Sequence, residues 1–152
     1  MREELCEAAG VQLLRWYDTQ ARVMPWRVGP EDRRLGVLPD PYHVCLSEVM
    51  LQQTQIDRVI PKWNAFLAAF PTPADCATAS LGDVLRLWQG LGYPRRARNL
   101  QAAAVVVVDL HGGKLPDDLD GLLALPGIGP YTARAVLAFA FERDVAVVDT
   151  NI

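Results

Sequence analysis

The sequence predicts an all-α protein. Apolar residues recur at helical spacing in several segments, and proline and glycine residues separate these segments. No segment shows the alternation of apolar and polar residues that is typical of a half-buried strand. The chain has 152 residues, 51% of them hydrophobic, which is enough for one domain with a buried core.

The N-terminal part predicts one helix and one loop. Residues 2–20 carry apolar side chains at helical spacing, so we expect an amphipathic helix there. Residues 23–40 contain three prolines and two glycines, and so many residues that interrupt helices and strands argue against regular structure. We therefore expect residues 23–40 to form a loop.

The next helix is expected to start at Asp40 and Pro41. Aspartate is a good N-cap, and proline is favoured in the first helical turn. This helix should run over about residues 42–55. Pro61 then predicts a kink or a new helix start before residues 63–70, because proline cannot donate the backbone hydrogen bond that a helix interior needs.

Two more helices are expected in the middle of the chain. Ser80 with Asp83 resembles a capping box with a shorter acid, and it opens a helix that runs through Trp88. Two glycines then break the chain. A further helix should cover residues 95–110 and end at the glycines of residues 111–113.

The C-terminal part predicts a helix, a tight turn and a second helix. Residues 117–124 should form a short helix, and residues 125–130 a turn rich in glycine and proline. Residues 131–141 are apolar and helical in pattern. Residues 145–148 are mostly β-branched, so we expect an extended, buried segment.

Composition narrows the cellular setting. Cys6, Cys45 and Cys76 are odd in number and widely spaced, so they predict neither a disulfide framework nor a metal-binding cluster. No apolar run is long enough to cross a membrane. Residues 1–7 open with charges and lack the apolar core of a secretory signal. We expect an intracellular, cytoplasmic protein without a membrane partner.

The charge pattern leaves a nucleic-acid partner open. A net charge of −3 argues mildly against such a partner, but local fields matter more than the sum. Arg95, Arg96 and Arg98 lie close together in the chain, beside the aromatic Tyr93 and the flexible glycines before it. An aromatic residue beside clustered arginines suits a nucleic-acid surface, although a solvated helix start has the same composition.

The turn at residues 125–130 is the most informative local feature. Gly127 and Gly129 let the backbone approach a partner closely and expose its N–H groups. The helix that follows directs its free N–H groups and its positive dipole end the same way. This arrangement predicts a phosphate-binding site without a basic side chain. A simple corner between two helices, with no ligand, explains the pattern as well.

Glu48 is the first candidate catalytic residue. It lies in a largely apolar helical segment, and partial burial there would raise its pKa and favour the protonated acid. A protonated glutamic acid near neutral pH can donate a proton. Gln52 and Gln55 share its helix face. The alternative is an ordinary helix whose glutamate reaches solvent.

Asp149 is the second candidate. It follows the apolar residues 145–148, so it can line a site at the end of that segment. The alternative is that Asp149 is the N-cap of a following helix. The two roles are compatible.

Four motifs together resemble the MutY-type adenine DNA glycosylases of the helix-hairpin-helix, or endonuclease III, superfamily. The resemblance covers nearly the whole chain, and the order and spacing of the motifs agree throughout. The block with Glu48 is the most specific, whereas the turn at residues 125–130, the hairpin of the superfamily's name, is shared by the wider superfamily. The motifs are residues 46–55, 90–93, 125–129 and 148–151.

The resemblance implies a fold and a reaction. The fold is the helix-hairpin-helix glycosylase fold, with a six-helix-barrel subdomain and the N-terminal helix of an incomplete second subdomain. Such enzymes act in base excision repair: they extrude adenine that faces 8-oxoguanine or guanine and hydrolyse its N-glycosidic bond. Double-stranded DNA with a mismatched adenine is therefore the expected partner, and we expect a monomer.

The resemblance also implies catalytic roles. Glu48 matches the acid that protonates the adenine ring, and Asp149 matches the carboxylate that stabilises the sugar cation or transiently bonds it. The pair parallels the two carboxylates of sugar hydrolysis. Tyr131 and Asn151 match residues that support these carboxylates by hydrogen bonds.

Further residues match the family's DNA contacts. Gln52 and Tyr93 match residues that insert into the base stack near the lesion. The hairpin matches the phosphate-binding element, which in this superfamily often holds a monovalent cation through backbone carbonyls. The remaining expected DNA-binding residues are Arg95, Leu125, Gly127, Ile128, Gly129, Tyr131 and Thr132.

Tyr131 distinguishes the chain from the endonuclease III-type enzymes of the same superfamily. Endonuclease III-type enzymes have a lysine here, which attacks the sugar and leads to strand cleavage. A tyrosine cannot form that Schiff base, so the resemblance implies a monofunctional glycosylase. A branch that removes thymine also carries tyrosine here but lacks the glutamate at the position of Glu48, so adenine is favoured.

The chain departs from the family pattern in three ways. Thr150 stands where many members have glycine, and the loop at residues 29–38 is longer than usual. The family normally continues into helices with four cysteines for a 4Fe–4S cluster. A C-terminal domain that recognises 8-oxoguanine then follows. Neither region is present, so we expect residues 1–152 to be a truncated catalytic domain.

Three alternatives stay open. The truncated chain can bind DNA without catalysis, or it can be an endonuclease III-like glycosylase with a different base specificity. A purely structural helical domain is the third.

Overall fold

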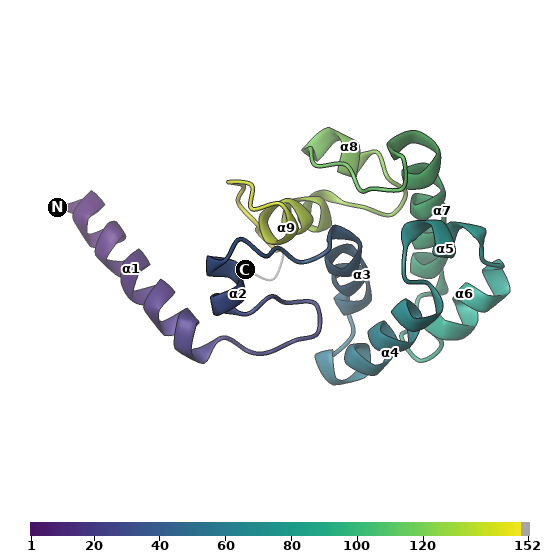
Figure 1. Cartoon of the computed structure of the whole chain (residues 1–152), viewed down its shortest axis with the longest axis horizontal. Coiled ribbons are helices and arrows are strands. Elements are labelled where there is room, and N and C mark those ends of the chain that lie inside the picture. The colour runs from purple at the N-terminus through teal and green to yellow at the C-terminus, as the bar shows by residue number, and fades with distance from the viewer. Residues whose placement is uncertain (150–152) are drawn as a thin grey trace.

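The computed structural model describes residues 1–149. Within this range the structure contains nine α-helices and no β-strand, which confirms the all-α prediction (Figure 1). The asparagine expected to support the catalytic carboxylates, Asn151, lies outside the described residues. None of the described helices is long and apolar enough to span a membrane.

Helices α3 to α9 pack around one hydrophobic core (Figure 1). Helix α3 lies against α4, α7 and α9; α5 and α6 pack on α7, α6 also contacts α4, and α8 packs on α9. The bounds are α3 Pro41–Leu51, α4 Ile56–Ala69, α5 Pro73–Thr78, α6 Leu81–Trp88, α7 Pro94–His111, α8 Leu119–Leu123 and α9 Pro130–Ala140.

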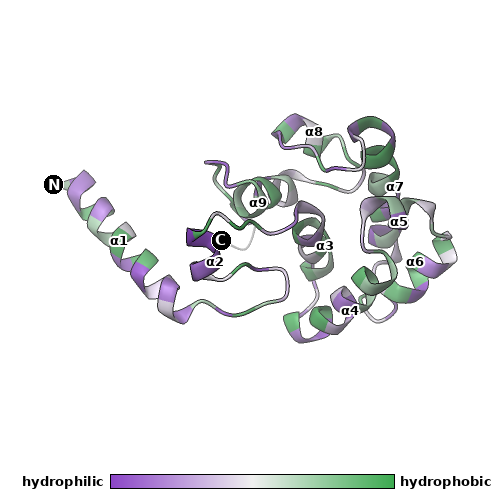
Figure 2. Cartoon of the chain, in the orientation of Figure 1, coloured by the Kyte–Doolittle hydropathy of each residue, from purple (hydrophilic) through white to green (hydrophobic). Residues whose placement is uncertain are grey.

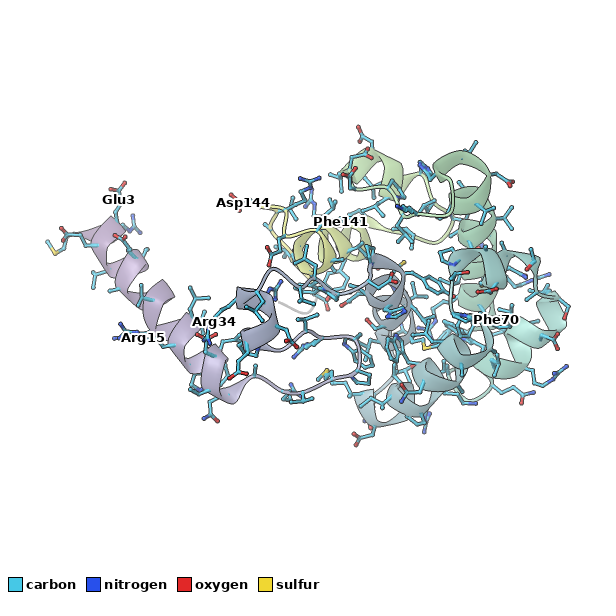
Figure 3. All side chains as sticks on the ribbon, in the orientation of Figure 1. Glu3, Arg15, Arg34, Phe70, Phe141 and Asp144 are labelled. Carbon is cyan, nitrogen blue, oxygen red and sulfur yellow. The ribbon has the colours of Figure 1, made fainter. Side chains whose placement is uncertain are left out.

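Helix α1 (Arg2–Gln20) stands apart from this core and buries none of its residues (Figure 3). The helix predicted for residues 2–20 is confirmed. Its apolar side chains, among them Leu13 and Trp16, are however exposed. Arg34 Nη2 in the next helix bonds Asp18 Oδ2 at 3.1 Å and ties the end of α1 to the rest of the chain.

Side-chain caps explain where several helices begin. Asp40 Oδ1 accepts the backbone N–H of Tyr42 at 2.8 Å, which starts α3 as predicted. Ser80 Oγ accepts the N–H of Asp83 at 3.1 Å and starts α6. Each cap satisfies a backbone donor that the first helical turn leaves unpaired.

The loop predicted for residues 23–40 is wrong in one part. Residues Pro30–Arg34 form a short helix, α2, with proline at its first position, acidic residues in its first turn and basic residues in its last. Those charges suit the helix dipole. Figure 2 shows α2 as a hydrophilic segment, with α1 on one side and α3 and α9 on the other.

Two helix boundaries also differ from the prediction. Helix α3 ends at Leu51 and not near residue 55, because Gln52 is extended and Gln53 is left-handed, with φ of 59°. Pro61 lies inside α4, so the alternative of a new helix start at Pro61 is wrong, whereas the alternative of a kink stays a prediction.

The sequence prediction missed helix α5. Its N-terminus is a full capping box: Thr72 Oγ1 accepts the N–H of Asp75, and Asp75 Oδ2 accepts the N–H of Thr72. This motif is visible in the sequence and could have been found. At the other end of the chain, the extended segment at residues 145–148 is not buried as expected, since Val148 is 64% exposed.

The turn between α8 and α9 requires glycine at position 127. Gly127 has φ of 76°, a left-handed conformation that other residues rarely adopt. A Cβ on Gly127 would lie 2.7 Å from Cβ of Asn99 in α7, far inside van der Waals contact. Gly129 has φ of −89° and open space around it.

We predict that Gly127→Ala lowers the free energy of unfolding by about 1–3 kcal/mol, because the variant adds backbone strain and a clash with α7. Gly129→Ala is the matched control in the same turn, and it should cost about 1 kcal/mol or less as the loss of a tolerated N-cap. Urea denaturation measures both. Equal losses in the two variants would contradict this account of the turn.

Candidate functional site

A cavity of about 270 Å³ lies between the loop after α1, helix α3 and helix α9. Apolar side chains form much of the cavity wall, and Glu48 of α3 contributes a carboxylate to it. Such a mixture of apolar walls and few polar groups is typical of a small-molecule site. The lining side chains include Arg22, Met24, Trp26, Arg27, Val44, Glu48, Leu51, Ile56 and Phe139.

The core packing of α3 sets the place of Glu48. Residues on both sides of it, Ser47 and Val49, are buried, and the helix is capped at Asp40. Glu48 itself is half-buried, as the sequence predicts. Desolvation is the largest influence on Glu48 and raises its pKa above the ordinary value of 4.5.

Three groups modify this effect. Tyr131 at the start of α9 hydrogen-bonds the Glu48 carboxylate, and this bond lowers the pKa of Glu48. The guanidinium of Arg27 also lowers it, whereas the charge of Asp149 raises it. Because desolvation dominates, the pKa of Glu48 remains raised.

The structure brings together residues that are far apart in the sequence. Asp149 lies close enough to raise the pKa of both Glu48 and Tyr131. Burial, which is the largest influence, the two carboxylates and the hydrogen bond to Glu48 all raise the pKa of Tyr131. The hydroxyl therefore stays protonated and donates to the carboxylate. Glu48, Tyr131 and Asp149 form one cluster beside the cavity.

Sequence analysis missed the loop side of the cavity. Trp26 is buried and packs edge-on against Trp63 of α4, with ring centroids 5.6 Å apart. This contact fixes the loop that carries Arg27 next to Glu48. The signal was an aromatic and a basic residue directly after Pro25, in a loop otherwise rich in glycine and proline.

Gln52 links the end of α3 to the start of α9. It is exposed, and its Nε2 donates to Oγ1 of the buried Thr132 at 3.1 Å. The buried Thr132 thus holds the side chain of Gln52 by a hydrogen bond. Tyr93, which precedes α7, is 61% exposed and left-handed, with φ of 48°.

The three arginines at the start of α7 differ in their exposure to solvent. Arg95 and Arg98 are exposed. Arg96 is turned inward and donates to backbone carbonyl oxygens of Val49 and Leu91 at 2.7 and 3.0 Å. The expected surface of three arginines is therefore wrong for Arg96.

The hairpin presents backbone rather than side chains. Leu125 and Ile128 are buried in the core, and the N–H of Ile128 bonds the carbonyl of Leu125 at 3.2 Å. Gly127 and Gly129 are exposed. Because the side chains of Leu125 and Ile128 are buried, any DNA contact at these two residues would involve their main chain.

The described residues do not fit a metal cluster. No group of three or more histidine, cysteine or acidic side chains within residues 1–149 is placed to hold a metal ion. Cys6 is exposed on α1, while Cys45 and Cys76 are buried in α3 and α5. A monovalent cation at the hairpin stays a prediction.

The curated relatives of the chain include adenine DNA glycosylases. The chain is 48% identical over 142 residues to the adenine DNA glycosylase of Mycolicibacterium smegmatis, covering 93% of the chain and 46% of the relative. It is 45% identical over 141 residues to the human adenine DNA glycosylase, covering 92% of the chain and 26% of the relative. The chain thus spans less than half the length of these relatives.

Solved structures share the fold. A thermostable thymine-DNA glycosylase matches with a TM-score of 0.80 and 27% identity, over 95% of this chain and 63% of that one. A non-covalent endonuclease III–DNA complex matches with a TM-score of 0.69 and 29% identity, over 75% of this chain and 54% of that one.

A family model covers the larger part of the chain. Residues 46–152 match the HhH-GPD superfamily base excision DNA repair protein. This range contains Glu48, the hairpin and Asp149, and it leaves out α1 and the loop that walls the cavity. The chain belongs to the HhH-GPD superfamily of base excision DNA repair proteins.

Proposed function

We propose that the chain is the catalytic part of a monofunctional DNA glycosylase that removes adenine mispaired with 8-oxoguanine or guanine. The observation that carries this proposal is Glu48: a half-buried carboxyl with a raised pKa, at a cavity, beside Tyr131 and Asp149. The names of the relatives support adenine as the base.

Base flipping would bring adenine into the cavity. An enzyme that acts on a base inside a duplex must first take the base out of the stack. The apolar wall offers contact to the faces of a flat base, and Glu48 offers a polar group at its edge. Trp26 and Met24 are buried parts of that wall, which makes the cavity a largely preformed site.

Glu48 acts as the general acid. Its carboxyl donates a proton to a ring nitrogen of adenine, the N-glycosidic bond breaks, and the bonding electrons leave with the base. Glu48 becomes a carboxylate, the form that Tyr131 and Arg27 stabilise by a hydrogen bond and by charge. Asp149 stabilises the positive charge that develops on the sugar, and water then adds to the sugar.

The DNA contacts follow from the surface around the cavity. The exposed glycines of the hairpin and the N-terminus of α9 would bind phosphate through backbone N–H groups. The exposed Arg95 adds positive charge. Gln52 and Tyr93 are exposed beside this surface and would insert into the base stack.

We predict that Glu48→Gln slows single-turnover release of adenine from a duplex with adenine opposite 8-oxoguanine by about 10²–10⁴-fold, the contribution of a general acid. Glutamine keeps the size of the side chain but cannot donate an acidic proton. The control is Glu31→Gln, which changes an exposed glutamate of α2.

Two outcomes would overturn the proposal. Unchanged release by the Glu48→Gln variant would remove Glu48 from the mechanism. Release of thymine from a thymine–guanine duplex, with adenine left in place, would show a different base specificity.

We also predict that borohydride does not trap a covalent complex between the protein and a duplex from which adenine has been released. Tyr131 cannot form a Schiff base. The lysines of the chain are Lys62 and Lys114, and neither lines the cavity. Alkali cleavage of the same product confirms that the abasic site has formed, and a trapped complex in high yield would contradict the monofunctional mechanism.

A further inference from the structure

The side chain of Arg96 joins two turns that are far apart in the sequence. Its Nη1 donates to the carbonyl oxygens of Val49, at 2.7 Å, and of Gln52, at the end of α3. Its Nη2 donates to the carbonyl oxygen of Leu91 at 3.0 Å, in the turn before α7. One guanidinium thus holds the turn at residues 52–54 against the turn at residues 90–93.

Both turns contain strained backbone. Gln53, directly after Gln52, has φ of 59°, and Tyr93 has φ of 48°. Residues other than glycine hold such angles only where the surrounding contacts require them. The strain therefore lies at or beside the two residues that we propose to enter the base stack.

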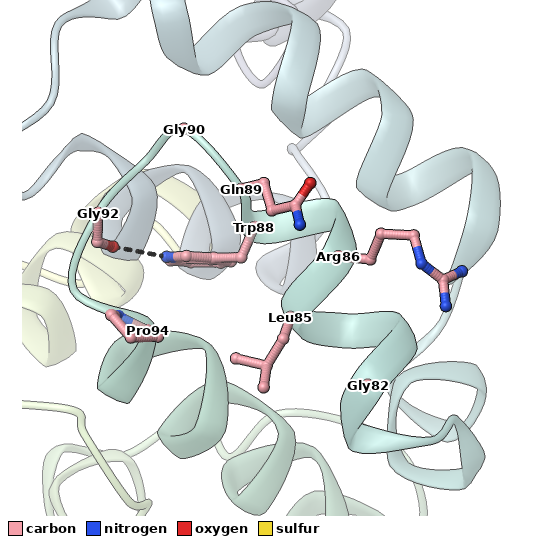
Figure 4. Close-up of a pocket in the computed structure, with 8 residues that line it drawn as sticks. All are labelled: Gly82, Leu85, Arg86, Trp88, Gln89, Gly90, Gly92 and Pro94. Atoms are coloured by element: carbon pink, nitrogen blue, oxygen red, sulfur yellow. Dashed lines mark hydrogen bonds between the residues drawn. The ribbon is translucent and has the colours of Figure 1, made fainter.

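Other contacts reinforce the same two turns. Trp88 Nε1 donates to the carbonyl oxygen of Gly92 at 3.1 Å, beneath the turn that joins α6 to α7 (Figure 4). Thr54 Oγ1 donates to the carbonyl oxygen of Leu91 at 3.2 Å and links the turns directly.

Stacking also places Arg96 next to Tyr93. The guanidinium carbon is 5.5 Å from the centre of the Tyr93 ring and 5.8 Å from that of Trp88. A guanidinium at this distance from an aromatic ring is attracted to it. Arg96 thus contacts the ring of one proposed inserting residue and the main chain of the other.

We infer that Arg96 is a positioning residue, which sets Gln52 and Tyr93 at a fixed spacing for insertion at the lesion. The inference rests on the proposed function, because Gln52 and Tyr93 are assigned to the base stack there. Arg96 differs in this from the exposed Arg95, which is free to meet phosphate. Its donors Nη1 and Nη2 are used inside the protein.

Arg96→Lys tests this role. Lysine keeps the positive charge but has neither the planar fork that reaches several carbonyls nor the flat group that stacks on a ring. Arg58→Lys, at an exposed arginine of α4 outside the two turns, is the matched control. Misplacement by about 1 Å can cost about 10²-fold in rate. We expect Arg96→Lys to slow single-turnover adenine release by about 10–100-fold and Arg58→Lys to have little effect.

A spectroscopic measurement follows the insertion itself. A 2-aminopurine placed next to the mismatched adenine fluoresces more strongly when its stacking is broken. Wild-type protein should increase this fluorescence, and Arg96→Lys should abolish most of the increase. Arg96→Gln, which removes the charge, should leave the salt dependence of affinity for undamaged duplex unchanged, because no phosphate contact is lost. A weaker salt dependence would identify Arg96 as a phosphate contact and overturn the inference.

A mutant cycle separates positioning from general destabilisation. In a Gln52→Ala, Tyr93→Ala background, Arg96 has no inserting side chains to position. Adding Arg96→Lys there should slow adenine release less than about twofold, because residues that act together are not additive. The same 10–100-fold loss in both backgrounds would overturn the inference.

Amide hydrogen exchange of the free protein provides a readout that needs no activity. Arg96→Lys should speed exchange at residues 52–54 and 91–93, with α4 unchanged. Unchanged exchange at both turns would overturn the inference. If Arg96→Lys speeds exchange at the turns but the wild-type protein releases no adenine, the result would instead count against the proposed function.

Discussion

The packing of α3 against α9 is the contact on which the rest of the structure depends. Seven of the eleven residues of α3 are buried, and α9 contributes Val136 and Leu137 to the same core. Each such apolar side chain stabilises the fold by about 1.5–3 kcal/mol. This packing places Glu48 beside Tyr131 and brings Gln52 to Thr132, so one contact supports both the proposed acid and a proposed DNA contact.

The cluster around Glu48 is a balance of opposing effects. Burial favours the protonated acid, while Tyr131 and Arg27 favour the carboxylate. Because burial dominates, the folded protein binds the proton of Glu48 more tightly than the unfolded chain does. The contribution of Glu48 to stability is therefore fully present below pH 4.5 and declines as pH rises from 4.5 to the pKa of the folded state. A site that holds a reactive acid costs stability at neutral pH.

The sequence is sufficient to predict the structural features that depend on residues close together in the chain. The cap at Asp40 and the turn at Gly127 depend on neighbouring residues, and both are found where expected. The position of Glu48 in an apolar helix is likewise enough to predict its partial burial. The inward turn of Arg96 and the approach of Arg27 depend on contacts between segments far apart in the chain, which spacing alone does not reveal.

The most direct test of the account is the pKa of Glu48 in the folded protein. Carbon-13 NMR of labelled glutamate side chains gives this value, with the Glu48→Gln variant assigning the signal. We expect a pKa above 4.5, which rises further in Tyr131→Phe because that variant removes a hydrogen bond to the carboxylate. A Glu48 signal that titrates at or below 4.5 would contradict the claim that burial prepares this residue to act as an acid.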